Sequence, residues 1–188
     1  MTLLLTGIAL WFVTHLFPIW MAERRKALGA SIGEGMVKAG VALLTLGAVA
    51  LMVTGYQNAP YTAIWTPPTF LVHLNNLLML LAIFVFIAGR MPSVVRRKIR
   101  HPQLAGVKIW ALAHLLVNGD LVSIVLFGGL LAWAVLAMIG SNRRDGSRGP
   151  LPESSTQGLV AHIGLTLIVF SATIYVHGML LDVWPLPG

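Results

Sequence analysis

Six histidines are the residues of this 188-residue chain that are best suited to chemistry. A neutral imidazole binds metals and haem iron, and it exchanges protons near neutral pH. Most of the six lie within or at the edges of long apolar stretches, where an ionisable group is costly and is by default a functional candidate. The histidines therefore define the candidate site, and the apolar stretches are the elements that must position them.

The composition gives the setting of these histidines. Apolar residues make up 57% of the chain and charged residues 10%, whereas a soluble domain carries about 25% charged residues. This excludes a water-soluble globule and a disordered chain. Because there is no cysteine, iron–sulfur clusters, thiolate-bound metals and disulfides are also excluded. An integral membrane protein remains, in which a metal would be bound by histidine, carboxylate or methionine.

Six apolar stretches have about the length that crosses ~30 Å of hydrocarbon as a helix. They cover residues 2–20, 36–56, 68–89, 104–118, 121–140 and 158–181. We expect an all-α, polytopic membrane helix bundle with six transmembrane helices, forming a single domain over residues 1–188.

Lysine and arginine are concentrated in alternate connections between these stretches. The basic connections contain residues 24–26, 90–100 and 143–148, whereas the connections at 57–67 and 118–120 have no lysine or arginine. By the positive-inside rule the basic connections are cytoplasmic, so we expect both termini outside. The net charge of +7 is then explained by the basic cytoplasmic connections, and we expect no nucleic-acid partner.

A haem held between two helices needs two imidazoles at similar depths in the membrane. With a rise of about 1.5 Å per residue, His15 and His114 meet this condition, and so do His73 and His114. The alternative for each histidine is structural, a hydrogen bond to a neighbouring helix. No two histidines stand four residues apart, as a zinc-binding helix requires.

Polar and aromatic neighbours surround His114 along its helix. Trp110 and Asn118 lie one turn before and one turn after it, on the same face. We expect the indole to line a cofactor and the amide to fix the imidazole tautomer. Arg100, with other cytoplasmic arginines such as Arg24, is expected to pair with haem propionates. Two interpretations of Asp120 stay open, that of a turn residue and that of a proton-handling group.

One block of residues carries a family resemblance. It consists of Arg100-His101-Pro102-Gln103, Gly106, Trp110, Ala113-His114-Leu115, Asn118-Gly119-Asp120, Leu126-Phe127-Gly128 and Trp133, with further matches at Thr14-His15, Gly55-Tyr56, Trp65 and His73. On these residues the chain closely resembles the NnrU family of multipass membrane proteins. That family also includes the plant zeta-carotene isomerase, a haem-containing membrane enzyme.

The resemblance implies a haem b (iron) cofactor held by His15 and His114, and it favours His15 over His73 as the partner of His114. It further implies isomerisation of an apolar polyene gated by the redox state of the iron, and a redox partner. The bacterial members imply a role in nitrite and nitric oxide metabolism (denitrification) at the bacterial inner membrane. Ala111 stands where the isomerase has a cysteine, so a thiolate ligand switch is excluded here.

Two other classes of function stay open. Arg100-His101-Pro102 followed by Gly106 also resembles the cofactor-binding signature of membrane methyltransferases, although the second motif of those enzymes is missing near the carboxyl end. The other class is a non-catalytic membrane scaffold, which would use its helices for packing alone.

Overall fold

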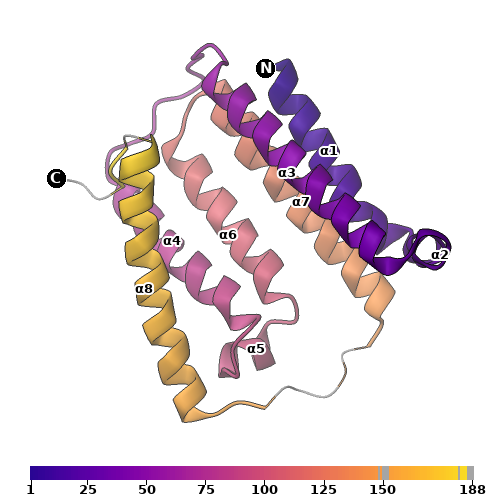
Figure 1. The fold of residues 1–188 in the computed structure, drawn as a ribbon. Coiled ribbons are helices and arrows are strands. Elements are labelled where there is room, and N and C mark those ends of the chain that lie inside the picture. Colours follow the sequence, from indigo (N-terminus) through magenta and orange to yellow (C-terminus); the bar gives the residue numbers. More distant parts are fainter. Residues whose placement is uncertain (148, 150–152, 182, 186–188) are drawn as a thin grey trace. The chain divides into compact units, whose positions relative to one another are not determined.

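The computed structural model describes residues 1–147, 149, 153–181 and 183–185, and these form helices without named strands. The helices are α1 (Thr2–Trp20), α2 (Ala22–Ile32), α3 (Glu34–Gln57), α4 (Leu71–Ala88), α5 (Val94–Lys98), α6 (Pro102–Val117), α7 (Leu121–Asp145) and α8 (Thr156–Leu181) (Figure 1). The expected all-α class is confirmed.

The long helices match the predicted apolar stretches closely. Five of them, α1, α3, α4, α7 and α8, are long and apolar enough to cross a membrane. The fourth predicted stretch forms α6, which has 16 residues and is shorter. Several apolar helices are what a multi-pass membrane protein contains, while the count of six spans and the outer location of both termini stay predictions.

The chain divides into two compact units. The first comprises residues 1–64 and 120–146, and the second residues 65–119 and 147–188. The first therefore contains α1, α2, α3 and α7, and the second contains α4, α5, α6 and α8. Within the first unit α7 packs on α1, and within the second α6 packs on α4. A single domain over residues 1–188 stays a prediction.

Glycines allow α1 to pack closely on α3 in the first unit. A Cβ at Gly7 would lie 2.8 Å from the main-chain nitrogen of Met52, and one at Gly55 would overlap the backbone of Leu4. Small residues at a helix contact let two backbones approach, which is how apolar helices associate in lipid. Because Leu4 meets Gly55 and Gly7 meets Met52, the two helices are antiparallel.

A neighbouring face of α1 packs on α7. A Cβ at Gly129 would lie 3.2 Å from Ile8, and one at Gly140 would lie 2.7 Å from Ile19. Because both numbers increase together, α1 and α7 run parallel, as the predicted topology requires of the first and fifth spans.

In the second unit α4 lies between α6 and α8 as their common packing partner (Figure 1). A Cβ at Gly106 of α6 would lie 2.7 Å from the side chain of Phe86. On the other side, the main-chain nitrogen of Ser155, just before α8, donates to the carbonyl of Pro92 at 3.2 Å. The histidine-bearing α6 and α8 are thus both fixed against α4.

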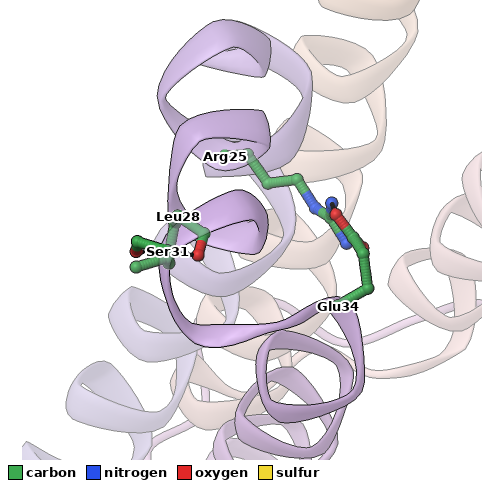
Figure 2. A network of polar contacts seen from close by, with 4 residues as sticks. All are labelled: Arg25, Leu28, Ser31 and Glu34. Carbon is green, nitrogen blue, oxygen red and sulfur yellow. Dashed lines mark hydrogen bonds and ion pairs between the residues drawn. The ribbon is translucent and has the colours of Figure 1, made fainter.

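Two short helices occupy segments that we predicted as loops, namely α2 and α5. Figure 2 shows the corner between α2 and α3, where the guanidinium of Arg25 bonds the carboxylate of Glu34 at 2.5 Å and the hydroxyl of Ser31 donates to the carbonyl of Leu28. Gly33, between the helices, has φ 90°, a conformation that favours glycine. The corner is therefore an ordered turn.

Two of the three connections that cross between the units are each hydrogen-bonded within one unit. In the first unit the main-chain nitrogen of Leu121 donates to the carbonyl of Thr62 at 2.8 Å, and in the second that of Trp65 donates to Gly119 at 3.1 Å. A Cβ at Gly119 would overlap the carbonyl oxygen of Trp65. Glycine is therefore required at this crossing.

Candidate functional site

His15 lies in the carboxyl-terminal half of α1, and its ring is held by a residue one turn earlier. Its Nδ1–H donates to the carbonyl oxygen of Trp11 at 3.0 Å, and its ring stacks on the Trp11 indole with 3.9 Å between centroids and 23° between planes. A carbonyl can only accept, so the neutral imidazole carries its lone pair on Nε2. This is the tautomer in which Nε2 can bind a metal.

Trp133 of α7 completes a cluster of three rings. It meets the rings of His15 at 5.6 Å and of Trp11 at 5.3 Å, in both cases edge to face at 79°. Its side chain is only 8% exposed. We call Trp11, His15 and Trp133 the first-unit ring cluster. Offset and edge-to-face rings restrict one another's rotation, so the cluster holds the imidazole in one orientation.

Buried donors without acceptors accompany this cluster. The indole nitrogens of Trp11 and Trp133 and the hydroxyl of Thr14 are buried and have no hydrogen-bond partner among the described residues. Each such group typically costs about 1–3 kcal/mol. The two indoles belong to rings that contact the His15 imidazole, which fits a site whose occupant supplies acceptor atoms.

His114 in α6 repeats the local arrangement in the second unit. Its Nδ1–H donates to the carbonyl of Trp110 at 2.9 Å, and the two rings lie 5.0 Å apart with 52° between planes. The side-chain amide of Asn118 donates at 2.8 Å to the main-chain carbonyl of His114. The Trp110 carbonyl therefore fixes the tautomer that we had expected Asn118 to fix, and Asn118 instead caps the end of the helix.

The two units thus share a Trp-x-x-x-His element. Sequence analysis identified it at Trp110 and His114 and missed it at Trp11 and His15, although the same spacing of four residues was the available signal. The contact of Trp133 with His15 has no such signal, because the two residues lie on different helices.

The remaining predicted site residues are His73, Arg100 and Asp120. His73 is exposed in the first turn of α4, and Arg100 is half-buried just before α6. His101 is the N-cap residue of α6, and the His177 ring donates to the carbonyl of Val183 at 2.8 Å. Asp120 accepts a hydrogen bond from the main-chain nitrogen of Ser123 at 2.9 Å. It is therefore the N-cap residue of α7, which agrees with the role of a turn residue.

His162 has the structural role that we gave as the alternative for every histidine. It is fully buried, its Nε2–H donates to the carbonyl of Phe84 at 2.7 Å, and its ring stacks on Phe84 with 4.2 Å between centroids. It therefore joins α8 to α4.

His15 belongs to the first unit and His114 and His73 to the second. The described residues show no bis-histidine site, and they contain no group of three or more histidine, aspartate or glutamate side chains that could hold a metal ion. The pairing of His15 with His114, like that with His73, stays a prediction.

The long apolar helices are those of a helical, multi-pass membrane protein. Each of its two units contains a histidine whose ring lies against a tryptophan ring. The chain belongs to the NnrU protein family, whose family model matches residues 3–185. This match covers both units and confirms the family predicted from the sequence. No curated protein and no solved structure matches the chain.

Proposed function

We propose that this protein is a haem b protein of the membrane, with His15 and His114 as the axial ligands. The observation that carries the proposal is the shared geometry of the two histidines. Each donates Nδ1–H to the carbonyl of a tryptophan four residues earlier, which leaves the lone pair on Nε2. Histidines that bind metals almost always donate their other ring N–H in this way.

The surroundings of both histidines fit a large, flat and mainly apolar group. Trp11 and Trp133 flank His15, and Trp110 lies beside His114. The buried donors of the first-unit ring cluster lack acceptors, as expected where an occupant contributes some. Arg100 is the proposed partner of a propionate, because guanidinium pairs well with carboxylate. Asn118 supports His114 through its main chain.

Haem iron, when bound, supplies one-electron redox chemistry and a coordination site for small ligands or a substrate double bond. With both histidines bound the iron would have no open position, so catalysis requires His15 or His114 to move away, whereas electron transfer requires neither to leave. On the family resemblance we propose either a redox-gated isomerase acting on an apolar polyene or a role in nitrite and nitric oxide metabolism. Both need a redox partner, and we place the protein in a bacterial inner membrane.

The test is the absorption spectrum of detergent-purified protein, oxidised and dithionite-reduced, for the parent and for His15→Ala and His114→Ala. We expect a sharp reduced alpha band in the parent that each substitution abolishes. His73→Ala is the matched control, because His73 is exposed and is the alternative ligand.

Two results would contradict the proposal. A parent that stays colourless after haem is supplied would exclude haem and favour a methyltransferase or a scaffold. Loss of the band in His73→Ala but not in His15→Ala would replace the ligand pair by His73 and His114.

A further inference from the structure

An open groove of about 540 Å³ lies where α1, α2 and α7 meet in the first unit. Its apolar part includes Ile19, Trp20 and Gly140, and its charged part includes Arg24, Arg143 and Arg144. Of these residues Arg24 is also a candidate partner of a haem propionate, and the others do not belong to the candidate haem site.

The contact between α1 and α7 forms the floor of this groove. A Cβ at Gly140 would lie 2.7 Å from Ile19 and 2.7 Å from the indole nitrogen of Trp20. The guanidinium of Arg143 lies over the Trp20 ring, 5.5 Å from its centroid. This cation–π contact holds the arginine at the groove.

The charges lining the groove favour an anion. Arg144 forms an ion pair with Asp145 at 2.7 Å, whereas Arg24 and Arg143 form no ion pair with any residue that the structure describes. The one carboxylate lining the groove is that of Glu23, in the first turn of α2, where it interacts favourably with the helix dipole. Two exposed guanidinium groups are thus available to an anionic ligand.

The groove lies where two apolar helices become polar. The apolar run of α1 ends at Trp20 and is followed by basic residues, and that of α7 ends at Gly140, just before Arg143 and Arg144. Tryptophan and arginine at such positions lie at the level of lipid headgroups. Basic pockets at the ends of membrane helices bind anionic headgroups.

We propose that this groove binds the headgroup of an anionic phospholipid, with Arg24 and Arg143 pairing its phosphate. Guanidinium forms two parallel hydrogen bonds with phosphate, and the apolar floor at Ile19 and Trp20 contacts the glycerol and upper acyl carbons. A soluble phosphate would use the arginines and leave this floor bare, so a lipid matches both halves of the groove.

Native mass spectrometry of the full chain released from nanodiscs tests the proposal. Nanodiscs contain phosphatidylglycerol, phosphatidylcholine or an equal mixture, and retained lipid is counted for the parent, Arg24→Gln, Arg143→Gln and the double variant. Lys38→Gln removes an equal charge from an exposed position of α3 in the same unit and outside the groove. It is the matched control.

We expect the parent to retain phosphatidylglycerol over phosphatidylcholine, each arginine substitution to weaken this retention roughly fivefold, and Lys38→Gln to leave it unchanged. Equal retention of both lipids, or no loss in the double variant, would overturn the proposal. So would full competition by inorganic phosphate, which identifies a soluble anion as the ligand. Loss of haem absorbance with phosphatidylglycerol retention unchanged would assign the arginines to propionates instead. This proposal does not depend on the haem proposal.

Discussion

The imidazole of His15 stacks on the Trp11 indole at 3.9 Å and donates its Nδ1–H to the carbonyl of that same tryptophan. Ring and main chain of one residue therefore set both the plane and the tautomer of the histidine. His114 and Trp110 repeat the hydrogen bond with a more tilted pair of rings. Since α1 and α6 belong to different units, each unit orients its own histidine.

Replacing Trp133 should loosen His15. Trp133→Phe keeps an aromatic edge near the imidazole, whereas Trp133→Leu removes it, so we expect haem affinity to fall roughly 10- to 100-fold in the leucine variant only. The imidazole ¹⁵N shifts of the haem-free protein should still report the Nδ1–H tautomer, because the Trp11 carbonyl that fixes it is unchanged. Trp184→Leu, at a 60% exposed position, is the control. Identical spectra for both Trp133 variants would contradict the role.

Small ligands should complement a missing imidazole. His15→Gly removes the ring and leaves the helix, so we expect low haem content that added imidazole restores, measured as the return of the reduced alpha band. His162→Gly is the control. Added imidazole should not change its reduced alpha band, because His162 is a packing residue bonded to Phe84 and is not a proposed haem ligand. Failure of imidazole to restore the band in His15→Gly would argue against ligation by His15.

Gly119→Ala should be destabilising. The added Cβ would overlap the carbonyl oxygen of Trp65, a backbone atom that cannot turn aside, and we expect a loss of about 1–3 kcal/mol in unfolding free energy. Gly128→Ala should instead raise the unfolding free energy slightly, since nothing lies within 4 Å of a Cβ there and alanine favours a helix over glycine by about 1 kcal/mol. Thermal unfolding in detergent measures both, and equal effects would show that the crossing tolerates a side chain.

Asp120 should act as a helix cap. It accepts from the main-chain nitrogen of Ser123, so Asp120→Ala should cost about 1 kcal/mol while Asp120→Asn, which keeps the acceptor, costs little. The same two variants test proton handling, because asparagine cannot titrate. An activity or potential whose pH dependence disappears in Asp120→Asn at unchanged stability would show that the carboxylate does more than cap α7.

The corner between α2 and α3 should weaken in acid. The hydrogen bond from Arg25 lowers the pKa of Glu34, and the same bond raises the pKa of Arg25. A carboxyl whose pKa is lower in the folded state stabilises that state above its ordinary pKa and loses this contribution as pH falls through its folded value. Glu34→Gln should therefore be slightly less stable than the parent at pH 7 and equal to it in acid. Thermal unfolding across this pH range is the measurement, and a difference that persists in acid would point to another cause.

The amino-acid sequence was enough to predict the class of the protein and the local part of the site. Hydropathy and the internal hydrogen bonding of a helix act over about 20 residues, so the long helices begin and end within a few residues of the predicted bounds. The same local rule places a tryptophan carbonyl one turn before His15 and one before His114, because residues four apart share a helix face. The family followed from fixed positions around His114.

Which helices pack together became clear from the fold and could not be predicted from the sequence. Apolar side chains gain little from one another over lipid, so the choice of partner rests on where small residues let backbones approach, as at Gly7, Gly55 and Gly140. That choice brought Trp133 to His15, buried His162 against Phe84 and set Arg143 over Trp20. Each contact joins residues far apart in the chain, and no spacing along the sequence carries it.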